Sequence, residues 1–164
     1  MRPAWVSWFV ACLAGLPAYP AAAQSTVGPN GYQCIVRHPV TARKVATLHV
    51  TEDGPFIVTA RVSRDGSMTI VYGTQFANEP PILQRLAQHH ECGHFELVTK
   101  SEFKANCYAL RRLDEEGLLD APAARLIRDD HCGMGRLHEA QGGSGIAYWE
   151  QTRALCSDLN LPPC

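Results

Sequence analysis

The chain has 164 residues, of which 46% are hydrophobic and 19% charged, with 15 Lys and Arg against 16 Asp and Glu. This length allows one or at most two small domains, and the hydrophobic content argues against a disordered chain. The balanced charge argues against nucleic acid as a partner, because such binding shows as a clustered basic excess. Seven cysteines are the compositional outlier, and an odd count does not suit a disulfide framework.

The N-terminal residues follow the order of a secretory signal peptide, with a basic start at Arg2, an apolar stretch and small residues ending at Ala23. An uncleaved anchor is the alternative, since the stretch could nearly span a bilayer. Pro17, Pro20 and the alanines before the expected cleavage site favour cleavage. A lipid attachment at Cys12 is disfavoured because few apolar residues precede it and the apolar run continues beyond it.

Cleavage after Ala23 predicts one mature domain over residues 24–164, exported to the periplasm or secreted, and no longer in contact with a membrane. It also removes Cys12 and leaves an even number of cysteines, which fits up to three disulfides in an oxidising compartment. Sequence alone does not select how they pair. The six are Cys34, Cys92, Cys107, Cys132, Cys156 and Cys164.

The first part of the mature chain is typical of short strands separated by turns. Four segments are rich in β-branched and aromatic residues, and Asp-Gly pairs lie in two of the turns between them. An antiparallel meander is the simplest interpretation, and its last strand could hold an extended peptide by edge pairing. The predicted strands are residues 32–38, 45–51, 55–62 and 68–72.

After Gly73 the apolar spacing changes to that of helices. Asn78 is the expected N-cap of a first helix, which has His90 and His94 on its inward face, and Ser101 is the expected N-cap of a second. Because strands come first and helices after, we expect one α+β domain. Further helices are predicted over residues 120–133 and 146–156.

His90 and His94 begin and end an HExxH motif. One helical turn brings two such imidazoles side by side, where both can reach one Zn²⁺ ion. Zinc lowers the pKa of a bound water, and Glu91 is placed to take its proton as it attacks a carbonyl carbon. An ordinary pair of helix histidines is the alternative, but two imidazoles on a buried face need polar partners, which favours the metal.

A catalytic zinc ion needs a third protein ligand. The metzincin extension is absent, because Leu97 and Lys100 stand where that class has Gly and His. Glu102 is the better candidate, since it opens the second helix, which a tight turn after His94 can fold back against the first. The alternative is a solvated glutamate that the helix dipole favours in a first turn.

With this third ligand the sequence resembles the gluzincin class of HExxH zinc peptidases, in which a glutamate on a later helix completes the site in a pattern such as ExxxD or ExxAN. Residues 102–109 read Glu-Phe-Lys-Ala-Asn-Cys-Tyr-Ala. They are similar to small minigluzincin-type peptidases and to secreted bacterial proteins with HEC(A/G)H and ADCxA-type motifs. The resemblance covers about residues 83–113 and implies a zincin-like helical part, zinc as cofactor and a peptide or protein substrate.

Asn106 departs from the family pattern, in which an aspartate often supports a ligand histidine. Its amide can accept a hydrogen bond from a ring N–H but brings no charge, so a lower catalytic rate is expected. A second hypothesis is therefore a disulfide-stabilised binding or inhibitory module that keeps the peptidase scaffold without useful turnover. The presence of Glu91 favours the enzyme, because a purely structural metal site does not need that carboxylate.

The resemblance also implies a disulfide between Cys92 and Cys107, because both cysteines occur together in proteins with these motifs. The helical wheel weakens this pairing, since Cys92 lies about 200° round the helix from His90. Pairing with Cys34 or Cys132 stays open, and so does a Cys₂His₂ structural zinc site, which an oxidising compartment disfavours.

Three residues outside the motif could stabilise an oxyanion opposite Glu91. His89, which directly precedes the motif, is expected at the surface or in contact with substrate. The three oxyanion candidates are His131, His138 and Tyr148.

Overall fold

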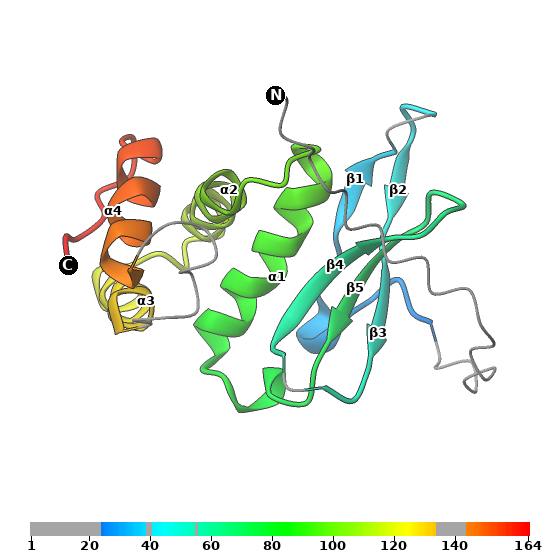
Figure 1. Cartoon of the computed structure of the whole chain (residues 1–164), viewed down its shortest axis with the longest axis horizontal. Helices are drawn as coiled ribbons and strands as arrows, with labels where there is room; N and C mark the ends of the chain where they lie inside the picture. The colour runs from blue at the N-terminus through cyan, green and yellow to red at the C-terminus, as the bar shows by residue number, and fades with distance from the viewer. Residues whose placement is uncertain (1–23, 39–40, 55, 134–143) are drawn as a thin grey trace, which may run out of the picture.

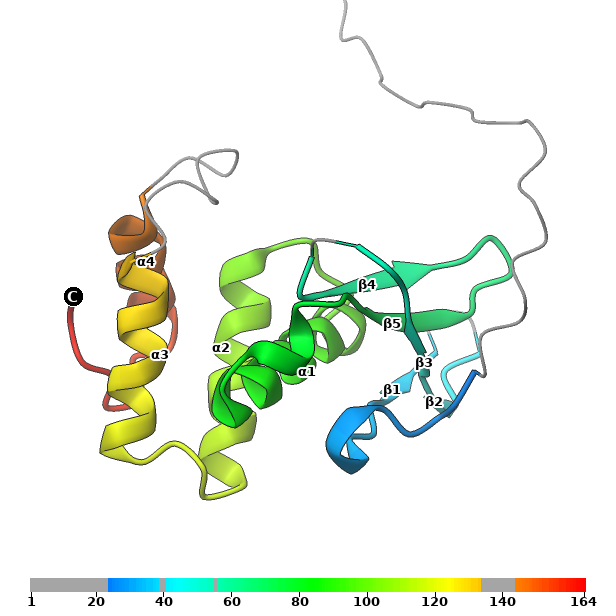
Figure 2. The same ribbon diagram turned by 90° about the horizontal axis from the view of Figure 1, so that it is seen from below.

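The computed structural model describes residues 24–38, 41–54, 56–133 and 144–164, so the predicted signal peptide lies outside it. Two small sheets precede four α-helices among the described residues, which confirms the α+β class. The sheets lie on one side of α1 and the other helices on its opposite side (Figures 1 and 2). The helices are η1 (Pro29–Gly31), η2 (Phe76–Asn78), α1 (Pro81–Glu96), α2 (Glu102–Glu115), α3 (Ala121–Gly133) and α4 (Gly145–Leu155), and the strands are β1 (Ile35–Arg37), β2 (Lys44–Ala46), β3 (Leu48–Thr51), β4 (Val58–Val62) and β5 (Met68–Tyr72).

The predicted antiparallel meander is wrong in its pairing. β1 and β2 form a separate antiparallel hairpin, while the second sheet has the order β3-β5-β4, with β3 parallel to β5. The segment predicted as one strand over residues 45–51 is divided at Thr47, whose buried N–H donates to the Cys34 carbonyl. β5 is therefore the central strand, and β4 is an edge strand that contacts α1.

The parallel pair arises because the chain after β3 crosses the end of β5 to reach β4. The Gly54 carbonyl accepts hydrogen bonds from the backbone N–H and the hydroxyl of Thr74, and the Ile57 carbonyl accepts one from the Gly73 N–H. Gly73 permits this crossing, because a Cβ there would lie 1.9 Å from the Phe56 carbonyl oxygen. A turn that looks local in the sequence thus joins opposite edges of the sheet.

The helices begin close to the predicted residues, with one correction at α1. Asn78 ends η2, and α1 begins at Pro81 after Pro80, which has an extended ψ of 143°. A residue that precedes proline avoids the helical region, so Pro80 cannot lie inside the helix. Ser101 caps α2 as predicted, since its hydroxyl accepts a hydrogen bond from the Lys104 N–H at 3.4 Å.

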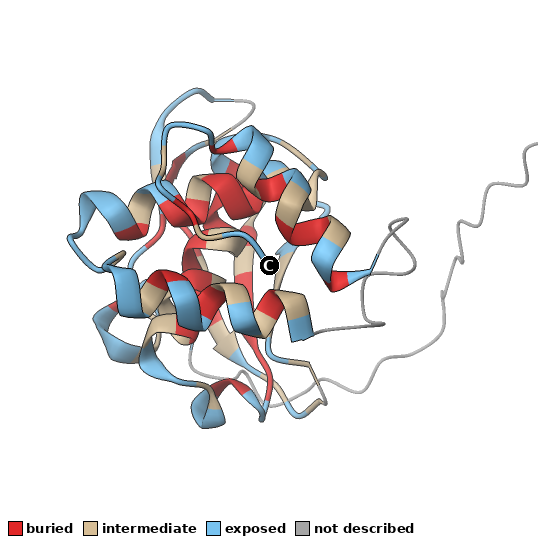
Figure 3. Ribbon diagram, turned by 90° about the vertical axis from the view of Figure 1, so that its left-hand side faces the viewer, coloured by how far each residue is buried: buried red, intermediate tan, exposed pale blue. Residues whose placement is uncertain are grey.

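α1 separates two hydrophobic cores, so its flanks are buried while a stripe between them faces a cavity. Buried residues recur along the helices between exposed ones, as Figure 3 shows. Within the described ranges, no helix is long and apolar enough to cross a membrane. Leu83 and Leu86 of α1 pack with the helical core of Leu110, Leu113, Ile127 and Trp149, whereas Cys92 and Phe95 pack with the sheet-side core of Val36, Ile70 and Tyr72.

Three disulfides link segments distant in the sequence, and they contradict the predicted pairing of Cys92 with Cys107. Cys92 faces the sheet-side core and Cys107 the helical core, so their thiols point apart. The open alternative of Cys92 with Cys34 is confirmed, and a Cys₂His₂ site on these thiols is excluded. Disulfides are typical of an oxidising compartment. The bonds are Cys34–Cys92, Cys107–Cys156 and Cys132–Cys164.

Candidate metal centre

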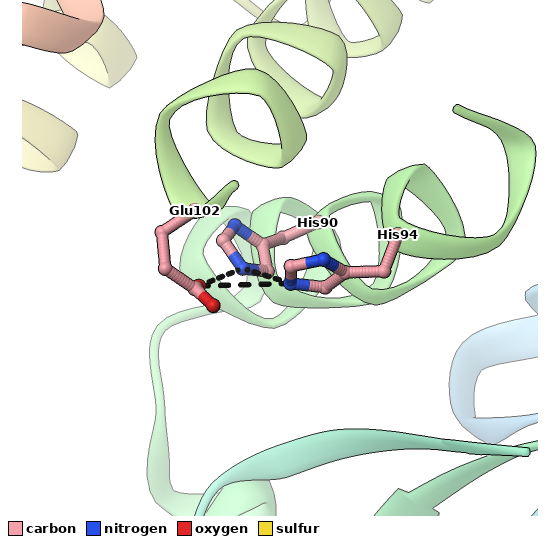
Figure 4. A group of neighbouring side chains, drawn as sticks. All are labelled: His90, His94 and Glu102. Atoms are coloured by element: carbon pink, nitrogen blue, oxygen red, sulfur yellow. Dashed lines mark hydrogen bonds and ion pairs between the residues drawn. The ribbon is translucent and has the colours of Figure 1, made fainter. Parts of the chain in front are cut away.

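The structure brings the three predicted ligands together between α1 and α2. His90 and His94 project from one face of α1, and Glu102 is the first residue of α2 (Figure 4). His90 Nε2 lies 2.9 Å from Glu102 Oε2 and 3.1 Å from His94 Nε2. His94 Nε2 lies 3.6 Å from the same carboxylate oxygen. One ligand atom from each residue could therefore hold a single metal ion.

The turn between the two helices orients the second histidine. α1 ends in a Schellman motif, in which the Thr99 N–H donates to the His94 carbonyl and the Val98 N–H to the Phe95 carbonyl. Val98 has a φ of 47°, in the left-handed region that usually belongs to glycine. The turn brings the Thr99 carbonyl to 2.9 Å from His94 Nδ1. The sequence did not reveal Thr99, because any residue can supply a backbone carbonyl.

Hydrogen bonds at Nδ1 fix which nitrogen of each ligand histidine faces the centre. A carbonyl oxygen can only accept, so His94 Nδ1 donates to Thr99, and His90 Nδ1 donates to Asn106 Oδ1 at 2.8 Å. The Nε2 lone pairs then point at each other and at the Glu102 carboxylate. Electron-rich atoms this close repel one another unless a cation lies between them.

The pKa shifts of the cluster agree with this need for positive charge. The imidazole groups of His90 and His94 hold the pKa of Glu102 well below its usual range. The hydrogen bond to Glu102 raises the pKa of His94, although burial opposes the shift. A proton or a metal ion can supply the positive charge, so the two compete for this position.

A cavity of about 240 Å³ is lined by two of the three ligands, His90 and Glu102. Glu91 lies on its wall, where burial raises the pKa of the carboxyl group against the lowering effect of His90 and His94. The backbone N–H of Ala60 on β4 also lowers the pKa of Glu91, which therefore lies between α1 and the edge strand. The apolar part of the wall consists of Ile57, Val58, Leu83, Leu86 and Ala87.

The three oxyanion candidates differ in where they lie. His138 lies outside the described residues. His131 lines the cavity, but Nδ1 of its buried ring donates to the Ile127 carbonyl and Nε2 lies 3.0 Å from the Asn106 amide. Tyr148 also lines the cavity, and burial, followed by the nearby carboxylates, raises the pKa of its hydroxyl group. Its hydroxyl therefore stays protonated and can donate a hydrogen bond.

His89 is buried on another side of α1, which corrects the expectation that it lies at the surface. Neighbouring residues of a helix point about 100° apart, so His89 turns away from the metal centre. Its Nδ1 lies 3.2 Å from the Tyr32 hydroxyl and its Nε2 lies 3.1 Å from Glu116. Arg85 pairs with the same carboxylate at 2.9 Å, so His89 lies beside an ion pair between Arg85 and Glu116.

No protein-family model, curated protein or solved structure matches the chain. The resemblance to gluzincins therefore stays a prediction that depends on the motif and on the convergence of His90, His94 and Glu102.

Proposed function

We propose that the protein is a small exported zinc peptidase, with His90, His94 and Glu102 as zinc ligands and Glu91 as general base. One observation carries the proposal. Two imidazole nitrogens and one carboxylate oxygen converge within 3.6 Å of one another, and Glu91 lines the adjoining cavity. Two histidines with one glutamate are a usual donor set for catalytic zinc, which keeps a position open for water.

The donor set and its spacing favour zinc over other ions. Calcium and magnesium prefer ligands that are all oxygen atoms. Ligands at zinc distances of 2.0–2.1 Å in a tetrahedron lie about 3.3 Å apart, close to the separations of 2.9, 3.1 and 3.6 Å seen here. Iron(II) also uses two histidines and one carboxylate, but a glutamate directly after the first histidine suits hydrolysis.

The residues around the cavity have distinct roles in breaking a peptide bond. Zinc in such a donor set lowers the pKa of water and polarises a carbonyl group. Glu91 accepts a proton from the attacking water and delivers it to the amine nitrogen as the C–N bond breaks. Tyr148 donates a hydrogen bond to the carbonyl oxygen as negative charge develops there. The edge of β4 beside α1 can bind an extended substrate through its main chain.

Export to the periplasm or outside the cell is part of the proposal. The three disulfides support it, because such bonds persist in oxidising compartments. The signal-like order of the N-terminal residues supports it independently.

Separate measurements of metal content and of hydrolysis test the proposal. The purified protein should contain one equivalent of zinc by elemental analysis and should cleave members of a fluorogenic peptide library. Glu91→Gln should keep the zinc and lose about 10²- to 10⁴-fold in cleavage rate, because it removes only the base. Glu96→Gln, at an exposed position of the same helix, is the matched control and should retain both properties.

Two outcomes would overturn the proposal in different ways. A parent protein without zinc contradicts the metal centre itself. A parent protein that binds zinc but cleaves no peptide faster than Glu91→Gln does supports the second hypothesis, a binding module on this scaffold, for which the neutral Asn106 is the favouring observation.

A further inference from the structure

We propose that His131 is a positioning residue, which sets the proton position on the ligand His90 through the side chain of Asn106. The inference rests on the proposed metal site. His131 Nε2 lies 3.0 Å from Asn106 Nδ2, and Asn106 Oδ1 lies 2.8 Å from His90 Nδ1. His131 Nδ1 lies 2.8 Å from the Ile127 carbonyl oxygen. One chain of hydrogen bonds thus runs from the backbone of α3 through α2 to α1.

The Ile127 carbonyl, at the start of this series of hydrogen bonds, decides which atom donates in each of them. The Ile127 carbonyl can only accept, so His131 Nδ1 carries the proton and Nε2 presents a lone pair. That lone pair needs a donor, and Asn106 therefore turns its NH₂ group to His131 and its oxygen to His90. His90 must then be protonated on Nδ1, which leaves the Nε2 lone pair for a metal ion.

Asn106 needs a partner such as His131 because its amide group can adopt two orientations. A carboxylate presents an acceptor whichever way it turns, so aspartate needs no such selection. An amide has nearly the same shape in its two orientations, and only one of them offers Asn106 Oδ1 to His90. The reverse orientation would place an NH₂ donor against the N–H of the His90 ring. The lone pair of His131 Nε2 therefore selects the orientation in which the Asn106 oxygen faces His90.

Burial and contacts with neighbouring rings fix the position of the His131 ring, so it can orient the Asn106 amide. Only 6% of the residue is exposed. The ring stacks on Tyr148 with 5.8 Å between centroids and 14° between planes, and its centroid lies 5.4 Å from that of Trp149. The Asp130 carboxylate lies 3.8 Å from Nδ1, farther than the Ile127 carbonyl, so the backbone oxygen sets the proton position.

Disulfides fix the three helices close to the points where the hydrogen-bond chain crosses them. Each helix carries a bonded cysteine within two residues of its contributing side chain. Hydrogen bonds weaken steeply with distance and angle, so this bracing preserves the chain. The neighbours are Cys92 after His90, Cys107 after Asn106 and Cys132 after His131, bonded to Cys34, Cys156 and Cys164.

Zinc affinity of the purified protein, measured by competition with a chromophoric chelator, tests the proposal without any assay of activity. His131→Met keeps the length of the side chain but offers only a weak acceptor, and we expect about 10- to 100-fold weaker zinc binding, as for other residues that support a ligand. His131→Gln can place an amide oxygen near the position of Nε2 but does not fix its own orientation, so it should bind zinc more tightly than His131→Met and more weakly than the parent. Thermal unfolding of the metal-free variants monitors their fold.

A double-mutant cycle separates positioning through Asn106 from damage to the fold. In an Asn106→Ala background, His131→Met should cause no further loss of zinc affinity, whereas a purely structural role would add its loss independently. The spectrum of the Co²⁺-loaded protein should likewise change in His131→Met and return towards the parent in His131→Gln.

Distinct outcomes would overturn the proposal. Equal zinc affinity in His131→Met and the parent contradicts the role of His131, and additive losses contradict action through Asn106. No zinc binding by the parent contradicts the metal site itself. If His131→Met does not fold, His131→Asn replaces it, since that amide can keep the bond to Ile127 but is too short to reach Asn106. The same loss of affinity is then expected.

Discussion

Two adjacent histidines of α1 each meet a glutamate from α2 or its C-terminal cap, yet they belong to different kinds of site. His89 meets Glu116 at the end of α2, together with Arg85. His90 meets Glu102 at the start of α2, together with His94. Because α2 folds back beside α1, one helix pair carries both sites, and they can be compared within the same scaffold.

The difference lies in the source of positive charge. At Glu116, burial opposes ionisation, but the hydrogen bonds from Arg85 and the nearby His89 outweigh it and lower the pKa of the carboxyl group. The guanidinium group is a permanent cation, so this network is already neutralised. At Glu102 an imidazole stands where the other site has a guanidinium group. The second imidazole, in place of a guanidinium group, therefore gives Glu102 neighbours that could hold a metal ion with it.

The largest expected difference between the two sites is the loss of zinc affinity when the glutamate of each is replaced. Glu102→Gln removes an anionic ligand, so we expect more than about 100-fold weaker zinc binding, because supporting residues alone account for 10- to 100-fold. Glu116→Gln is the matched control and should bind zinc as the parent does. It should instead lower the free energy of unfolding by about 1–3 kcal/mol, since Arg85 and His89 lose their charged partner.

Chelator competition and urea unfolding of both variants measure these effects. An equal loss of zinc affinity in Glu102→Gln and Glu116→Gln would show that the metal binds elsewhere or that both carboxylates act only through the fold.

Residues related by one helix or one short turn could be predicted from the sequence. The spacing of His90 and His94 follows from the helical repeat, and Glu102 follows from a cap at Ser101 only a few residues later. The support of a ligand by Asn106 could be predicted for the same reason, because it lies one turn after Glu102. The helical spacing in α1 and the cap of α2 were thus sufficient to predict all three candidate ligands.

Features that depend on packing between distant segments could not be predicted. The crossing to β4 depends on how closely Gly73 approaches Phe56, and no local turn signal shows it. The partner of Cys92 depends on which core each helix face meets. His131 was predicted as an oxyanion candidate from residue type alone, whereas its contact with Asn106 exists only because α3 packs beside α2.

A third buried histidine shows what burial does without a carboxylate partner. The ring nitrogens of His49 face the Tyr72 hydroxyl at 2.8 Å and the Thr47 hydroxyl at 3.3 Å, and burial lowers its pKa below 6.5. As the pH falls through about 6.5, the unfolded chain takes up a proton that folded His49 resists, so unfolding becomes easier. This residue should contribute up to about 1.4 kcal/mol of lost stability per pH unit.

Urea unfolding of the metal-free protein between pH 8 and pH 5 measures this contribution. His89 contributes in the same direction, because burial also lowers its pKa. The contribution of His49 is therefore the difference in slope between the parent and His49→Gln, which should be less sensitive to pH. Identical slopes would show that His49 takes up its proton equally well in the folded state.

The smallest expected effect concerns the turn that brings the Thr99 carbonyl to His94. Val98 is 74% exposed, so few contacts offset the cost of about 1–2 kcal/mol for a side chain in the left-handed region. Glycine removes that cost but adds about 0.5–1 kcal/mol of freedom to the unfolded chain. Val98→Gly should therefore raise the free energy of unfolding by about 0.5–1 kcal/mol, and zinc affinity should not change, because the turn and its bond to His94 persist.

Leu97→Gly is the matched control for this prediction, because Leu97 is also exposed but has the helical φ of −90°. Glycine there relieves no strain and should lower the free energy of unfolding by about 0.5–1 kcal/mol. Urea unfolding of the two variants should thus give shifts of opposite sign at neighbouring apolar positions. If both variants lost stability, the exposed side chains would be making contacts worth more than the backbone strain. A gain at Val98 alone would show that the turn beside His94 is kept at a cost in stability, unlike the ion pair between Arg85 and Glu116.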